Sequence, residues 1–198
     1  MSHSKKIFIK GLDFSDIERV KQAGIITRID SKGKLYALAD QPPKFKDIPL
    51  TFCSFFCKGY ASAYKRQGVL FSTEAKPVYA CPADSIELMR QGDWIPGHEK
   101  YLLDSVDDLI CAFPASTDFR KDFANFFSSL DAGQIFSSSA IDKKEAELYF
   151  ETDYCLKKQW LEHEDAYNEV TFENPVKINV ISEYQSLQEL AEIMEKIG

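Results

Sequence analysis

The stretch GVLFSTEAKPVYAC, residues 68–81, consists of two short apolar runs separated by a polar corner. The runs Gly68–Phe71 and Pro77–Cys81 contain the β-branched and aromatic residues that are enriched in strands. Proline is tolerated at the first residue of a strand, where Pro77 stands. The stretch therefore predicts two neighbouring strands in the first half of the chain.

Four other segments of the first half have apolar patterns typical of regular structure. They predict, in chain order, a strand over Lys6–Ile9, a helix over Ser15–Ala23, a hairpin of Ile25–Ile29 with Lys34–Leu38, and a buried helix over Leu50–Tyr64. Gly24 suits the left-handed residue that ends many helices. The apolar residues after Leu50 are too dense for a strand with one wet face, which favours a helix there.

The remaining chain favours helices. It predicts, in order, a helix over Pro82–Met89, strands over Lys100–Leu103 and Leu109–Phe113, a phenylalanine-faced helix over Phe119–Leu130, one or two helices within Ile141–His163, a strand over Val176–Ile181 and a helix over Leu187–Ile197. Ser186 and Glu189 have the spacing of a capping box for the last helix. The predicted class is α+β, with a mixed or antiparallel sheet in a strand-rich N-terminal half and a helix-rich C-terminal half.

The chain of 198 residues has the usual length of one domain, residues 1–198. Hydrophobic residues make up 44% and aromatic residues 13%, a composition that excludes a disordered chain. The serines at 137–139 are suited to a hinge, and they leave open a helical subdomain over residues 140–198.

Charge divides unevenly between the two halves. Residues 1–100 carry 16 Lys and Arg against 11 Asp and Glu, a net of +5, and residues 101–198 carry 8 against 20, a net of −12. A charge of +5 spread over a hundred residues disfavours constitutive nucleic-acid binding. The acidic C-terminal half, with runs at Asp104–Asp108 and Glu162–Asp165, suits a basic protein partner, although such runs are most often solvated faces.

Cysteine and histidine usage limits the chemistry. The five cysteines, an odd number without a dense framework, are expected to be free thiols of a reducing compartment. His98 and His163 are the histidines outside the N-terminal tail, and no HExxH or CxxC spacing occurs, so no metal site is expected. No apolar run reaches the length of a signal peptide or a membrane span, and we expect a cytoplasmic protein without a membrane partner.

One order of residues points to an enzyme. Arg28 ends a predicted strand, Ser72 and Thr73 end another, and Glu99 precedes a third. This order resembles the pattern of ADP-ribosyltransferase-like toxins. The resemblance implies that fold, NAD as cofactor, Arg28 on the pyrophosphate, Ser72 and Thr73 bracing the site, and Glu99 stabilising the cationic ribosyl centre as nicotinamide leaves.

Aromatic side chains could complete such a site, because Tyr60 or Tyr64 could stack on the nicotinamide ring. The alternative interpretation stays open. In that interpretation Arg28 is a surface charge, residues 72 and 73 form a turn, and Glu99 is a solvated loop residue.

A second resemblance covers about thirty-five residues of the same region. Asp47-Ile48-Pro49-Leu50, then Tyr60, Gly68–Glu74 and Pro77-Val78-Tyr79, are similar to the middle of the AbiGi-type abortive-infection family of phage-resistance proteins. Both resemblances imply a bacterial conflict system, either toxin–antitoxin or phage defence. The sequence thus leaves two functions: an ADP-ribosyltransferase-like enzyme, or a non-enzymatic immunity or antitoxin protein whose acidic C-terminal half binds a basic protein.

Overall fold

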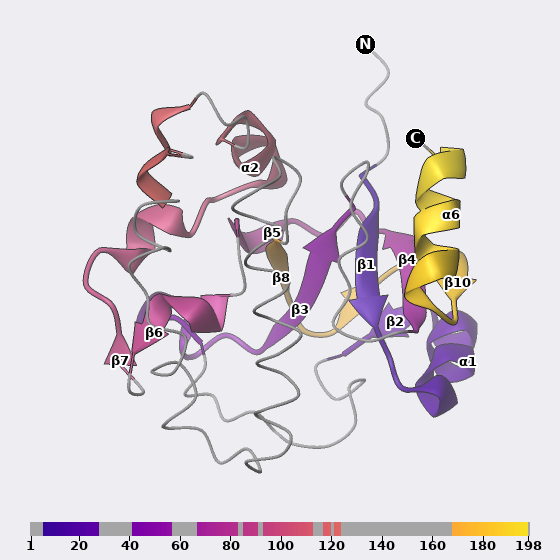
Figure 1. The fold of residues 1–198 in the computed structure, drawn as a ribbon. Coiled ribbons are helices and arrows are strands. Elements are labelled where there is room, and N and C mark those ends of the chain that lie inside the picture. The colour runs from indigo at the N-terminus through magenta and orange to yellow at the C-terminus, as the bar shows by residue number, and fades with distance from the viewer. Residues whose placement is uncertain are drawn as a thin grey trace.

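A six-stranded antiparallel sheet forms the centre of the fold, with the strand order β10-β4-β1-β3-β8-β5 (Figure 1). The computed structural model describes residues 6–27, 41–56, 67–82, 85–90, 93–112, 117–119, 121–123 and 168–197. The C-terminal strands β8 and β10 pair with strands of the N-terminal half, so the two halves of the chain share one sheet.

The described elements have the following bounds. The strands are β1 Phe8–Gly11, β2 Ile25–Ile26, β3 Leu50–Phe55, β4 Gly68–Ser72, β5 Pro77–Cys81, β6 Met89–Arg90, β7 Asp93–Trp94, β8 Glu169–Glu173, β9 Val176–Lys177 and β10 Asn179–Tyr184. The helices are α1 Phe14–Ala23, α2 Val106–Ala112 and α6 Leu187–Ile197, with 3-10 turns η3 Pro43–Phe45, η4 Ser85–Leu88 and η5 His98–Tyr101. Strands β2 and β9 form one small antiparallel pair, and β6 and β7 form another.

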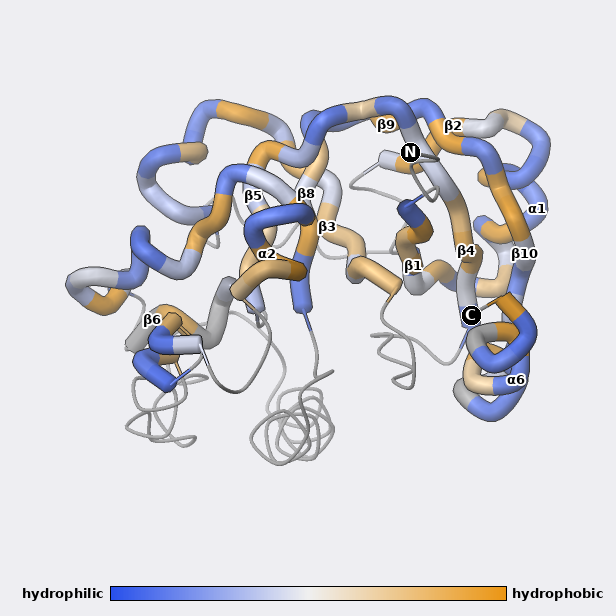
Figure 2. The backbone as a smooth tube through the Cα atoms, turned by 90° about the horizontal axis from the view of Figure 1, so that it is seen from above, coloured by the Kyte–Doolittle hydropathy of each residue, from blue (hydrophilic) through white to orange (hydrophobic). Residues whose placement is uncertain are grey.

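The two faces of the sheet bury separate apolar clusters. On one face, Phe8 lies opposite Phe55 and Phe71 in the register, and this cluster also contains Val20 of α1 and Leu109 of α2. On the other face, a second cluster covers the β5 side, where Tyr79 and Cys81 pack with Leu50, Tyr101 and Phe123. A third covers the β10 side, where Ile9, Leu70 and Tyr184 pack with Leu190 of α6. Hydrophilic stretches of α1 and α6 flank β10 (Figure 2).

The predicted helix over Leu50–Tyr64 is wrong at its start, because Leu50–Phe55 is the strand β3. This strand lies between β1 and β8 in the interior of the sheet, where both of its faces contact apolar residues. Such a strand loses the alternation of a half-exposed strand, and its dense apolar run cannot be told from a buried helix by periodicity. Most of the remaining range, 57–64, lies outside the described residues.

Three other local predictions are corrected. The predicted strand at Leu109–Phe113 belongs to the helix α2, whose Asp108 amide donates to Ser105 Oγ at 3.1 Å in an N-terminal cap. The predicted strand at Lys100–Leu103 is mostly the turn η5, although Leu103 forms a bridge with Ala80. The predicted helix at Pro82–Met89 is reduced to the turn η4 and the first residue of β6.

Several predictions are confirmed. The structure contains β1, α1 with Gly24 in the left-handed region at φ 61°, β4, β5 and α6. Half of the predicted capping box of α6 forms, since the Glu189 amide donates to Ser186 Oγ at 3.1 Å, whereas the Glu189 carboxylate accepts from the Gln185 amide and not from that of Ser186. The α+β class holds with an antiparallel main sheet.

Predictions for parts of the second half cannot be compared with the structure. The predicted helices within Ile141–His163 and beyond Phe123 lie outside the described residues, as do positions 28–29 and 34–38 of the predicted hairpin. Within the range suggested for a helical subdomain, 140–198, the strands β8 and β10 belong to the main sheet.

Gly68 is required by close backbone packing at the start of β4. A Cβ atom built there would lie 2.1 Å from the carbonyl oxygen of Lys10 and 2.7 Å from the hydroxyl oxygen of Tyr184. Both neighbours belong to the strands that pair with β4, namely β1 and β10. A side chain at this position would therefore push apart the three strands at this end of the sheet.

Substitutions that overpack a protein interior typically cost about 1–3 kcal/mol of stability. We expect the loss in Gly68→Ala to lie at the upper end of this range or above it, because the backbone of β1 has to move. Gly97→Ala is the matched control. Gly97 has φ 86°, and no atom of the described residues lies within 4 Å of the position that a Cβ would take. Gly97→Ala should therefore lower the free energy of unfolding only by the cost of a side chain in the left-handed region, about 1–2 kcal/mol. Urea unfolding of both variants measures the difference, and an equal or smaller loss for Gly68→Ala would contradict the packing described above.

Candidate functional site

The residues predicted to bind NAD are distributed as follows. Arg28, Tyr60 and Tyr64 lie outside the described residues. Ser72 is the last residue of β4 and Thr73 follows it, whereas Glu99 lies in η5. Of the predicted site residues, the structure therefore describes Ser72, Thr73 and Glu99.

Ser72 and Thr73 hold the corner after β4. Thr73 Oγ1 donates to the carbonyl oxygen of Lys177 at 2.7 Å and accepts from the Ala75 amide at 3.1 Å, which fixes the turn against β9. Ser72 lies opposite Asn179 of β10, and its buried Oγ has no hydrogen-bond partner in the described part of the chain. The corner thus acts as a structural brace.

Glu99 lies at the other side of the sheet. Its side chain is 62% exposed, and four residues later Leu103 exchanges two 2.8 Å backbone hydrogen bonds with Ala80 of β5. Strands β1, β3 and β8 lie between β4 and β5, as Figure 1 shows. Within the described residues, no hydrogen bond or ion pair joins Ser72 or Thr73 to Glu99, and the NAD site stays a prediction.

A buried hydrogen-bonded network lies beneath the β5 side instead. The Tyr79 hydroxyl donates to Glu169 Oε1 at 2.9 Å and lies 2.9 Å from Ser85 Oγ, and all three side chains are buried. Burial, reinforced by the nearby Glu169 carboxylate, raises the pKa of Tyr79 well above its usual value, so the phenol stays neutral and donates. The network connects β5, η4 and β8, and it satisfies polar groups that would be costly to bury alone.

This network was missed at the sequence level, because β8 itself was not predicted. Residues 169–173, EVTFE, alternate strictly between polar and apolar residues, which is a strand signal, and they begin and end with a glutamate. Glu169 faces the buried side, opposite Cys81. Nothing in the sequence marks one of these two glutamates as buried, since only the pairing of β8 between β3 and β5 decides it.

His98 is also buried. Its Nδ1 lies 2.7 Å from the carbonyl oxygen of Ile95, so this nitrogen donates a proton there, and the buried Nε2 has no hydrogen-bond partner in the described part of the chain. Trp94 packs on the His98 ring at 4.9 Å between centroids and joins the cluster over β5. The described residues contain no group of three or more His, Cys, Asp or Glu residues placed to hold a metal ion.

One of the two acidic runs noted in the sequence serves the helix α2. Asp107 forms an ion pair with Lys6 at 2.7 Å, and Asp108 Oδ2 accepts from the Ser105 hydroxyl at 2.6 Å. Negative charge in the first turn of a helix is stabilising because it faces the positive end of the helix dipole. The other run, Glu162–Asp165, lies outside the described residues.

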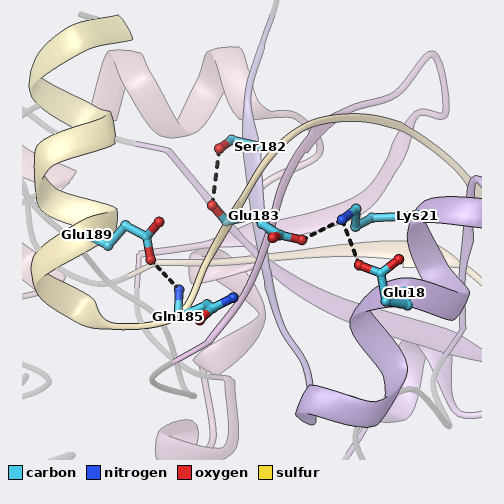
Figure 3. Close-up of polar contacts among 6 residues, drawn as sticks. All are labelled: Glu18, Lys21, Ser182, Glu183, Gln185 and Glu189. Atoms are coloured by element: carbon cyan, nitrogen blue, oxygen red, sulfur yellow. Dashed lines mark hydrogen bonds and ion pairs between the residues drawn. The ribbon is translucent and has the colours of Figure 1, made fainter.

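Carboxylates from distant parts of the chain converge at the β10 side of the sheet. Lys21 of α1 lies 2.8 Å from Glu18 Oε1 and 2.6 Å from Glu183 Oε2 of β10, as Figure 3 shows. Hydrogen bonding to Glu18 and Glu183 raises the pKa of Lys21. Two carboxylates thus share one ammonium group at a solvent-exposed position.

The carboxylates of α6 extend this surface. Residues 179–197 contain four glutamates and one lysine, a net of −3. Glu189 Oε2 accepts from the Gln185 amide at 2.7 Å (Figure 3), and Glu192 accepts from Gln188 at 3.3 Å. Neither Glu192 nor Glu195, both exposed, has an ion-pair partner in the described part of the chain. We call Glu18, Glu183, Glu189, Glu192 and Glu195 the acidic edge.

Comparison of the chain with protein-family models, curated proteins and solved structures finds no match. Within the described residues, no helix has the length and apolar character needed to cross a membrane. The function is therefore argued from the geometry of the chain itself.

Because three strands lie between β4, which ends at Ser72, and β5, we expect the protein and its Glu99→Gln variant to release nicotinamide from NAD at the same background rate. Chromatography of the nicotinamide formed during a long incubation measures both rates. A clear NAD turnover that Glu99→Gln abolishes would show that these residues do form an active site.

A second prediction concerns stability in alkali. Burial raises the pKa of the Cys53 thiol to about 12 from an ordinary value of 9.0, although nearby Lys10 opposes this. Above pH 9.0 the thiol ionises in the unfolded chain but not in the folded one, which favours unfolding. The free energy of unfolding should therefore fall by about 1.4 kcal/mol per pH unit through this group until the pH approaches about 12.

Cys53→Ala should reduce this alkaline slope, whereas Cys111→Ala, at an exposed position of α2, should leave it unchanged. Urea unfolding at a series of pH values above and below 9.0 gives the slope for each protein. Equal slopes for Cys53→Ala and the unmodified protein would show that this thiol is not buried in the folded state.

Proposed function

We propose that this protein is a non-enzymatic member of a bacterial conflict system, an immunity or antitoxin protein whose acidic C-terminal part binds a basic protein. The acidic edge is the binding surface. The resemblance of residues 47–79 to the AbiGi-type family supports the placement in phage defence or toxin–antitoxin biology.

The observation that carries the proposal is the shared ammonium group at Lys21. Glu18 and Glu183 are far apart in sequence, yet the fold brings their carboxylates within 2.8 Å and 2.6 Å of one cation. A surface that already holds one ammonium group between two carboxylates has the spacing to hold lysine and arginine side chains of a partner. Glu192 and Glu195 of α6 add exposed negative charge without an ion-pair partner among the described residues.

Two further points favour binding over catalysis. Strands β1, β3 and β8 lie between β4, which ends at Ser72, and β5, which Leu103 bridges four residues after Glu99, and this order supports binding over the predicted NAD site. The acidic edge repels phosphate groups, which argues against a dinucleotide or a nucleic acid at this surface. The same field accelerates association with a basic protein, by roughly 10- to 1000-fold at low salt.

The test compares two double variants that remove equal charge. Glu192→Gln with Glu195→Gln alters the acidic edge, and Asp47→Asn with Asp93→Asn alters exposed carboxylates on the β5 side. We expect the first pair to weaken the binding of a lysine-rich peptide about 2- to 30-fold, because exposed ion pairs contribute about 0.2–1 kcal/mol each. The control pair should have little effect.

Titration calorimetry at low and high salt measures both affinities, and binding should weaken as salt screens the charges. An unmodified protein that binds no basic peptide at low salt would refute the proposal. Equal losses in the two double variants would show that binding follows net charge and not the acidic edge.

A further inference from the structure

Strand β10 is the open edge of the main sheet. Among the described residues it pairs with β4 alone, whereas β5, at the opposite end, is bridged by Leu103. A strand at the end of a sheet presents backbone amide and carbonyl groups along its outer side. These groups can accept a further strand.

The two helices beside β10 cover the faces of the sheet and not its edge. Val20 of α1 belongs to the cluster on one face, with Val69 and Phe71 of β4. Leu190 of α6 belongs to the cluster on the other face, with Leu70 and Tyr184. Figure 1 shows α1 and α6 at the β10 end of the sheet.

Ile181 marks the centre of this edge. The register of β10 against β4 shifts between Val180 and Ser182, which makes Ile181 the additional residue of a bulge. Its side chain is 42% exposed, one of four large apolar side chains recorded as exposed among the described residues. An exposed apolar residue on an edge strand is a contact that an added strand would bury.

We propose that the partner docks by adding an extended, lysine- or arginine-rich segment to the outer side of β10. This inference rests on the proposed function and specifies how the basic partner binds. Backbone hydrogen bonds to β10 would supply affinity, burial of Ile181 would add an apolar contact, and the acidic edge would select a basic sequence.

The charges around β10 select this occupant. Side chains of an added strand alternate between the two faces of the sheet. Glu183 faces α1, where Glu18 and Lys21 lie, and α6 with its glutamates covers the other face (Figure 3). Basic residues at alternate positions of the segment would therefore meet carboxylates whichever face they point to.

A second copy of this chain is a poorer occupant of the same edge. Pairing β10 with another β10 would bring two Glu183 side chains and two acidic α6 helices together. Like charges that face each other across strands are destabilising. The six carboxylates of α1, β10 and α6 outnumber the four cations near the edge, which are Arg19, Lys21, Lys177 and Lys196.

The experiment uses the full chain and a synthetic peptide of about ten residues in which lysine and valine alternate, a length typical of a long strand. Ile181→Lys places a positive charge on the edge. Ile110→Lys makes the same change on α2, at a residue of similar exposure, 47% against 42%, on the side of β5. The two variants have equal net charge, so a binding difference between them reports position.

We expect Ile181→Lys to weaken peptide binding about tenfold or more, and Ile110→Lys to weaken it no more than the small change in net charge requires. Hydrogen exchange on the unmodified protein gives a second measurement that needs no variant. Bound peptide should slow the exchange of amides in residues 179–184, because an added strand takes up outward amide groups.

The outcomes separate this inference from the proposed function. Suppose that the peptide binds, that the two lysine variants lose the same affinity for it, and that hydrogen exchange in residues 179–184 does not change. Docking at the edge of β10 is then overturned, while the proposed function of the acidic edge is retained. If the peptide does not bind the unmodified protein at low salt, the proposed function fails, and edge docking with it. Self-association that Ile181→Lys abolishes would assign the edge to a second copy and overturn the inference.

Discussion

Pairing of the C-terminal strands with the N-terminal strands is the constraint on which the rest of the structure depends. Strand β8 inserts between β3 and β5, and β10 adds to β4, so two segments of the acidic half become part of a sheet begun by the other half. Non-local pairing of this kind costs chain entropy, which the apolar clusters on both faces offset. Gly68 permits it at one end, because β1 and β10 both approach β4 closely there.

The same pairing bears on both proposed functions. Insertion of β8 places three strands, β1, β3 and β8, between β4, which ends at Ser72, and β5. Addition of β10 brings Glu183 beside α1, where it shares Lys21 with Glu18. This second pairing forms the surface on which the binding proposal rests. Part of the negative charge of the C-terminal half therefore lies at the acidic edge.

Local signals in the sequence identified the elements whose ends are fixed by capping residues within the same segment. The helix α6 was predicted at its observed bounds because Ser186 and Glu189 cap it, and α1 because Gly24 ends it. Elements that depend on pairing with distant strands were harder to predict from the sequence. The run beginning at Leu50 is a strand because β1 and β8 lie on either side of it, and the burial of Glu169 depends on Tyr79, whose hydroxyl donates to its carboxylate. The convergence of Glu18 and Glu183 has no local signal.

Cross-strand contacts of β8 and β10 in solution test the central claim most directly. Nuclear Overhauser spectroscopy of the full chain should show Thr171 close to both Phe52 and Tyr79, and Glu183 close to Val69, as their register requires. These contacts would establish the strand order that separates Ser72 from Glu99 and leaves β10 at the edge. Contacts of Thr171 with neither strand, or a further strand paired with the outer side of β10 in the free protein, would contradict the account.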